Sequence, residues 1–266
     1  MAFYLSLAGC VKQIDREITG GNTDLIAVDG ILTSERKAQT IVLNHPVNKL
    51  NDPAVPLSGA TVIIHSKDST WTLAEEPAGS GKYKTPSSFF AVLNKSYTLN
   101  IFSGSSVYSA QAYMVPGTAF PQLTYARNDK DTLFHIEYVA SAFSNTGPAM
   151  WEVLLDWTRV PGYQNADTNK CKARLLFYTL PTLDVSEIFA PVVEQVFFPL
   201  GTLITERRYS LAPQHAEFIR EMLLETSWQG GLFPTAAANV STNLSPGAVG
   251  FFGVCAVNEL SMIVTK

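Results

Sequence analysis

The sequence has few charged residues and few cysteines. Only 16% of its 266 residues are charged, the formal net charge is −4, and no basic run occurs. Nucleic-acid-binding domains carry clustered Lys and Arg, so no nucleic-acid partner is expected. Apart from Cys10, the cysteines are Cys171 and Cys255, which are too few for a disulfide framework. An oxidising compartment would allow them to pair, but free buried thiols are the favoured interpretation.

Long apolar runs and the short motifs of common enzymes are also missing. The longest apolar stretch beyond the N-terminus, residues 248–257, is too short for a transmembrane helix, which needs about 20 residues. No Gly-x-Ser-x-Gly elbow and no His-Glu-x-x-His helix occurs. The segment AGSGK at 78–82 resembles a phosphate loop but has Glu76 and Tyr83 where that motif needs Gly and Ser or Thr, so it predicts a hairpin turn.

One pair of metal-ligand residue types remains. His135 and Glu137 would share one face of a strand, but no third ligand has a recognisable spacing. We therefore interpret the pair as part of a solvated polar face. We expect a protein that is not an enzyme and that uses no metal or cofactor.

The N-terminus carries the most informative motif. Leu7-Ala8-Gly9-Cys10 follows a short apolar opening and resembles the lipobox of a bacterial lipoprotein. Residues 1–9 would then be the remnant of a signal peptide, and Cys10 would be the lipidated first residue of the mature chain. Each buried methylene contributes about 0.8 kcal/mol, so two or three acyl chains would hold the protein at a membrane. The alternative is an N-terminal strand in which Cys10 is an ordinary buried residue.

A signal peptide normally opens with basic residues, but none precedes Lys12. We therefore expect the translation start to lie upstream of Met1. Residues 10–23 are polar and end near a Gly-Gly pair, which is typical of a flexible tether between a lipid and a globular body.

Residues 24–115 predict an N-terminal β-sandwich of immunoglobulin-like or transthyretin-like type. Short β-type runs are separated by Gly, Pro, Asn and Asp, as in sandwiches. The strands are expected at 25–32, 39–44, 60–65, 69–73, 97–102 and 107–115.

Residues 116–121 predict a linker, because two prolines and a glycine interrupt both helices and central strands. Residues 122–266 are expected to form a second β-sandwich-type domain that carries one α-helix at about 213–228. Pro213 suits the helix start, His215 should lie at the surface, and an apolar stripe should pack on a sheet. Strands are expected at 132–140, 151–160, 173–179, 193–208 and 249–264, the last broken at 258–259.

Trp151 and Trp157 are the candidate ligand-binding residues. They lie on one side of an expected strand, where aromatic rings could stack on a sugar. The favoured alternative is sandwich core, because Glu152 and Asp156 already supply a polar opposite face.

Several segments together are similar to a known family. They are VDGILT at 28–33, PLSGATV at 56–62, GKY at 81–83, YTLNI at 97–101, RYSL at 208–211 and GFFGVCAV at 250–257. The sequence resembles an uncharacterised family of Bacteroidota outer-membrane lipoproteins, classed as domain of unknown function 4249 and often encoded beside TonB-dependent receptors.

This resemblance implies a non-enzymatic, lipid-anchored outer-membrane protein that assists a TonB-dependent receptor or captures its substrate, which could be a glycan or a peptide. It supplies no catalytic residue and leaves open whether the body faces the periplasm or the outside. The alternatives are a surface adhesin or envelope-assembly module with the same anchor, and a surface hydrolase of glycans or peptides. Fold alone does not choose among them.

Overall fold

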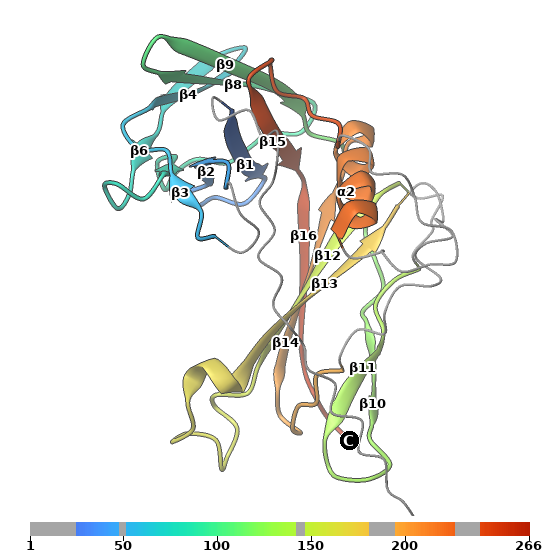
Figure 1. Ribbon diagram of the computed structural model, residues 1–266. Helices are drawn as coiled ribbons and strands as arrows, with labels where there is room; N and C mark the ends of the chain where they lie inside the picture. The colour runs from blue at the N-terminus through green and yellow to red at the C-terminus, as the bar shows by residue number, and fades with distance from the viewer. Residues whose placement is uncertain (1–24, 48–51, 142–146, 181–194, 227–239) are drawn as a thin grey trace, which may run out of the picture.

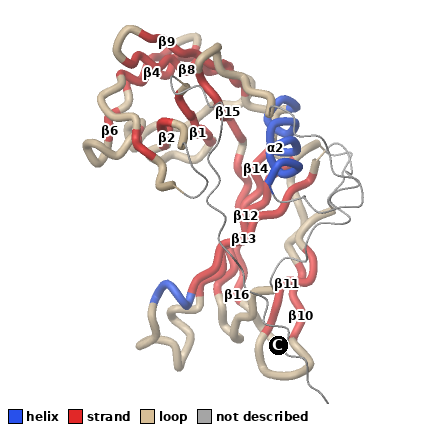
Figure 2. The backbone as a smooth tube through the Cα atoms, in the orientation of Figure 1, coloured by secondary structure: helices blue, strands red, loops and turns tan. Residues whose placement is uncertain are grey.

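The structure, a computed structural model, describes residues 25–47, 52–141, 147–180, 195–226 and 240–266 (Figure 1). Within these residues the chain is mainly β and has one α-helix, which confirms the predicted class of β-sandwich-type domains carrying a helix. Figure 2 shows the strands in an upper body and a long lower sheet, with the helix beside their junction. Cys10 and the tether expected at 10–23 lie outside the described residues.

Two sheets build the upper body, which we call the N-terminal part. The strands of the first sheet are β1 (Ile26–Thr33), β2 (Thr40–His45), β3 (Val55–Pro56), β6 (Ala74–Glu75), β7 (Lys82–Lys84) and β15 (Ala248–Cys255). Their order is β15-β1-β2-β7-β6, and β3 pairs with β2. The second sheet contains β5 (Ser69–Thr72), β4 (Thr61–Ser66), β8 (Ser96–Ser103) and β9 (Ser106–Tyr113), in that order.

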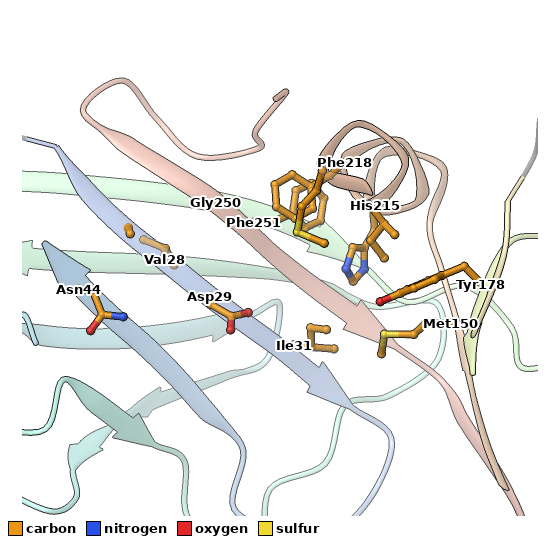
Figure 3. A pocket seen from close by; sticks show the side chains of 13 residues that line it. Val28, Asp29, Ile31, Asn44, Met150, Tyr178, His215, Phe218, Gly250 and Phe251 are labelled. Carbon is orange, nitrogen blue, oxygen red and sulfur yellow. The ribbon is translucent and has the colours of Figure 1, made fainter. Parts of the chain in front are cut away.

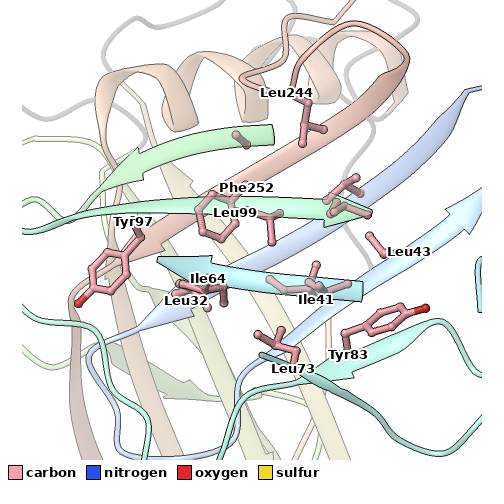
Figure 4. Packing of buried hydrophobic residues seen from close by; sticks show 14 of the residues in the cluster. Leu32, Ile41, Leu43, Ile64, Leu73, Tyr83, Tyr97, Leu99, Leu244 and Phe252 are labelled. Atoms are coloured by element: carbon pink, nitrogen blue, oxygen red, sulfur yellow. The ribbon is translucent and has the colours of Figure 1, made fainter. Parts of the chain in front are cut away.

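The core of the N-terminal part lies between these sheets (Figure 4). Alternation along β2 and β4 directs Ile41, Leu43, Val62 and Ile64 inward, and all four are completely buried. Burying one such side chain contributes about 1.5–3 kcal/mol. Strand β4 therefore lies where the β-type run at residues 60–65 predicted a strand.

Strand β15 comes from the end of the chain but belongs to the N-terminal part. It pairs in parallel with the whole of β1, from Ile26 opposite Ala248 to Thr33 opposite Cys255. The next strand, β16 (Val257–Ile263), enters the other sheet. The expected break at 258–259 was wrong by two residues: the strands separate at Ala256, where the chain passes from one part to the other.

The lower body, or C-terminal part, centres on a four-stranded sheet. Its strands are β13 (Lys172–Thr179), β12 (Ala149–Asp156), β14 (Leu203–Ser210) and β16, in that order. A hairpin of β10 (Thr124–Arg127) and β11 (Phe134–Tyr138) and a 3₁₀ turn, η1 (Thr168–Cys171), complete it. The strand expected at 193–208 begins only at Leu203 among the described residues, and Phe198 before it makes an isolated bridge to Phe134.

Helix α2 (Pro213–Thr226) covers the junction of the two parts (Figure 1). Ile219 and Leu223 pack with Leu211 and Cys255, so part of the expected stripe does face a sheet. The prediction for His215 was wrong, because this side chain is buried at the start of the helix. No helix in the described part of the chain is long and apolar enough to cross a bilayer.

Candidate functional site

An apolar cavity of about 390 Å³ lies at the junction, beside α2 (Figure 3). Small-molecule sites commonly enclose about 300–1,000 Å³. Both parts of the molecule contribute to its wall, together with the helix. The lining residues are Ala27, Val28, Asp29, Ile31, Asn44, Met150, Tyr178, His215, Phe218, Ile219, Met222, Gly250 and Phe251.

Three stacked rings form one wall of the cavity. Phe251 of β15 stacks with two side chains of α2, with His215 at 4.7 Å and Phe218 at 4.9 Å between ring centroids. The interplanar angles are 18° and 25°, so the rings are nearly parallel. This contact fixes the helix to β15 and gives the cavity a flat aromatic surface.

His215 reaches its buried position because Gly253 has no side chain. A Cβ atom at Gly253 would lie 2.5 Å from His215 Cε1, well inside van der Waals contact. Burial lowers the pKa of His215 to about 4, so the imidazole is neutral near pH 7. The first turn of α2 can therefore enter the junction without carrying a charge with it.

His215 Nδ1 also lies 3.8 Å from the Sγ atom of Cys255. Burial raises the pKa of this thiol to about 12, so it stays protonated. A reactive cysteine needs a lowered pKa and access to solvent, and Cys255 has neither. The pair is thus part of the packing behind the aromatic wall and not a nucleophilic dyad.

A few polar groups border the apolar surface. Asp29 is exposed and Asn44 half-buried, on β1 and β2. The surrounding protein raises the pKa of Asp29 by desolvation. Burial also raises the pKa of Tyr178, although the positive charge of Arg174 opposes the shift. A mostly apolar cavity with few polar groups suits a small, largely apolar ligand.

A network of charged side chains joins the two parts. Glu152 of β12 accepts hydrogen bonds from Arg174 Nε at 2.5 Å, Arg207 Nη1 at 2.7 Å and Tyr209 Oη at 2.9 Å. Arg207 also pairs with Glu35, which follows β1 in the N-terminal part. Because Glu152 and Arg207 are largely buried, the network fixes the relative position of the sheets that border the cavity.

The tryptophans singled out by the sequence lie in the core of the C-terminal part. Trp151 is 6% exposed and Trp157 is 7% exposed, as the core interpretation expects. Trp151 Nε1 donates to Thr179 Oγ1 at 3.0 Å, and its ring meets Phe120 edge-on. Both indoles are therefore largely covered by core side chains, and Trp151 also contributes to the wall of a smaller pocket. Cys171 and Cys255 are both free and buried, as favoured from the sequence.

The glycine-rich segment at 78–82 lies in the turn between β6 and β7, which confirms the hairpin interpretation. A carboxylate already occupies a backbone donor of this turn, because Glu75 accepts from Gly81 N–H at 2.9 Å. The same carboxylate also accepts from Gly59 N–H, outside the turn, at 3.2 Å. Gly81 has a φ of +66°, and a Cβ there would lie 2.3 Å from the Leu43 carbonyl oxygen. The glycine therefore serves close strand packing.

His135 and Glu137 do not gather further ligands. Glu137 is exposed and lies 3.4 Å from Thr124 Oγ1, whereas His135 is half-buried next to Phe197. Among the described residues no group of three His, Cys, Asp or Glu side chains is placed to hold a metal ion.

Sequence reasoning missed the cavity, although its residues lay in recognised segments. The stripe of α2 was assigned to packing alone, but Phe218 packs against the core and also lines the cavity, as does Met222 on the same helix. The run Gly250-Phe251-Phe252-Gly253 was a signal for this site that could have been used. It places two large rings between glycines, and a glycine lets another segment pack close to the strand.

The fold and the cavity define a mainly β protein of sandwich-type domains whose junction, covered by one helix, holds a space of small-molecule size. The chain belongs to the family described as Domain of unknown function (DUF4249), whose sequence profile matches residues 11–261. This match spans both β parts and the helix. No curated protein matches the sequence.

Proposed function

We propose that this protein is a binding protein that captures a small, largely apolar ligand at the junction cavity without altering it chemically. The observation that supports the proposal is the 390 Å³ cavity itself, to which both β parts and α2 contribute. Its titratable neighbours His215 and Cys255 are held in their neutral, packed forms, which suits binding rather than nucleophilic catalysis.

The proposal places the protein at the outer membrane, anchored through lipid on Cys10 and working with a TonB-dependent receptor in nutrient uptake. The lipobox-like Leu7-Ala8-Gly9-Cys10 and the family resemblance support this part. A capture protein beside a transporter needs a ligand site and an attachment to the same membrane, and the chain offers a candidate for each.

Ligand capture is tested with the uncharged fluorophore N-phenyl-1-naphthylamine. We expect saturable fluorescence enhancement on the purified chain and at least a tenfold weaker signal for Ala27→Trp, which fills the cavity. Ala54→Trp, at an exposed position away from the cavity, is the matched control and should bind as the parent does. Equal binding by both variants would contradict the cavity assignment.

The membrane and receptor parts are tested in the native host. Mass spectrometry of the mature chain should find acyl chains on Cys10, and Cys10→Ser should release the protein from the membrane fraction. Affinity purification of the lipidated protein in mild detergent should recover an outer-membrane receptor in stoichiometric amount. Absence of the receptor under these conditions would remove the transport partnership while leaving ligand capture intact.

A further inference from the structure

A second, smaller pocket lies on the opposite face of β12 and β13 from the junction cavity. Its volume is about 230 Å³, and Trp151 and Thr179 contribute to its wall. Their chain neighbours Met150 and Tyr178 line the junction cavity. Successive strand residues face opposite sides of a sheet, so the two spaces are separate.

The guanidinium group of Arg208 borders this pocket and lacks a counter-charge. Arg208 is only 4% exposed. Its contacts are with the neutral groups Ser210 Oγ and the Gly147 carbonyl oxygen, both at 3.4 Å, the limit of a hydrogen bond. No carboxylate of the described residues forms an ion pair with it. Arginine stays protonated even when buried, so an uncompensated positive charge faces the pocket.

Glu206, two residues away on the same face of β14, does not supply the missing charge. It is completely buried, and its Oε2 accepts the Leu123 N–H at 3.0 Å while Oε1 has no partner among the described residues. Burial raises the pKa of this carboxyl, which favours its neutral form. An isolated buried charge is strongly unfavourable, so an anion supplied from outside the chain would stabilise Arg208.

Aromatic rings stand beside the guanidinium group. Arg208 Cζ lies 5.5 Å from the Trp151 ring centroid, within cation–π range. Phe120 meets Trp151 edge-on at 4.9 Å between centroids, and Tyr138, 52% exposed, lies at the rim. An anion entering the pocket would thus meet one cationic fork and a wall of rings.

We propose that this space, the Arg208 pocket, binds a small organic acid, with the carboxylate on the Arg208 guanidinium and the apolar body against Phe120, Trp151 and Tyr138. The planar fork of arginine matches a carboxylate and holds it through two parallel hydrogen bonds. The volume of about 230 Å³ restricts the ligand to a size below that of drug-like molecules. This binding is independent of the junction cavity.

Isothermal titration calorimetry with benzoate tests the assignment, with benzamide as the uncharged isostere. We expect saturable binding of benzoate with a 1:1 stoichiometry and at least tenfold weaker binding of benzamide. Equal affinity for the two compounds would overturn the role of the charge. Tighter binding of sulfate than of benzoate would overturn the carboxylate assignment, and no saturable binding of benzoate or phenylacetate would overturn the pocket as a whole.

Variants then locate the site. Arg208→Gln should weaken benzoate binding at least tenfold, and Arg208→Lys should keep an intermediate affinity, since it retains the charge without the fork. Arg127→Gln, an exposed arginine of the same part, is the matched control and should not change it. Tyr138→Ala at the exposed rim should weaken binding several-fold without disturbing the core, so the test holds even if Arg208→Gln does not fold. Unchanged affinity in both Tyr138→Ala and Arg208→Lys would overturn the proposal.

The same proteins separate this site from the junction cavity. N-phenyl-1-naphthylamine should bind Arg208→Lys and Tyr138→Ala as it binds the parent, while benzoate binding falls. Loss of both ligands in parallel would contradict two independent sites.

Discussion

Arg207 and Glu152 face each other across neighbouring strands, and Arg207 Nη1 donates to Glu152 Oε2 at 2.7 Å. The two side chains are only 11% and 7% exposed. Arg207 reaches Glu35 in the N-terminal part, and Glu152 is held by Arg174 and Tyr209 in its own part. The charges therefore compensate one another at the junction, in contrast to the uncompensated charge of Arg208 on the opposite face.

Removing the charge of Glu152 should be strongly destabilising. Glu152→Gln leaves Arg207 largely buried with one carboxylate partner fewer, and breaking a buried pair in this way costs about 3 kcal/mol or more. Urea unfolding measures the change in free energy. Arg174→Gln removes the exposed partner of the same carboxylate, and we expect less than about 1 kcal/mol for it. Similar losses of unfolding free energy in the two variants would contradict the conclusion that Glu152 is the buried counter-charge of Arg207.

The network should also make stability depend on pH. Burial raises the pKa of Glu152, but the hydrogen bonds from Arg174 and Tyr209 and the nearby positive charges outweigh it, so the pKa is lowered from 4.5. A lowered carboxyl pKa contributes stability that is present above pH 4.5 and is lost as the pH falls through the folded-state pKa. Urea unfolding between pH 7 and pH 3 should show this loss, and it should be smaller in Glu152→Gln.

Glu206 should have the opposite pH dependence. Burial raises the pKa of Glu206 above 4.5, so the folded state binds the proton more tightly than the unfolded state does. Stability therefore falls as the pH rises from 4.5 through the folded-state pKa. Glu206→Gln keeps an oxygen acceptor for the Leu123 N–H and removes the ionisation. It should stabilise the protein at pH 7 by about 1.4 kcal/mol for each unit by which folding raises the pKa. The gain should vanish below pH 4, and a gain independent of pH would contradict this origin.

The contact between Gly253 and His215 should be sensitive to one methyl group. Gly253→Ala places a carbon 2.5 Å from His215 Cε1. Overpacking of this kind costs about 1–3 kcal/mol, and thermal or urea unfolding would measure it. His215→Ala removes the ring, so in that background Gly253→Ala should cost much less. An undiminished cost in the double variant would show that the clash lies elsewhere.

Much of the fold could be predicted from local patterns. The β-type run at residues 60–65 located β4, and Pro213 with the apolar stripe located α2. These predictions succeeded because strands and helices leave a periodic pattern of apolar residues among close neighbours in the sequence. The position of His215 could not be predicted in this way, because its burial depends on Gly253, which is distant in sequence.

The sequence by itself determined the class of the protein: its strands, its one described helix, its free buried cysteines and its family. Only the tertiary structure decided where binding could occur. The junction cavity exists because β15 returns to pair with β1 while β16 continues into the other sheet. The Arg208 pocket exists because that arginine lies on the face of β14 opposite Arg207, away from the carboxylates that neutralise its neighbour. Both depend on contacts between residues far apart in the chain, which no local pattern encodes.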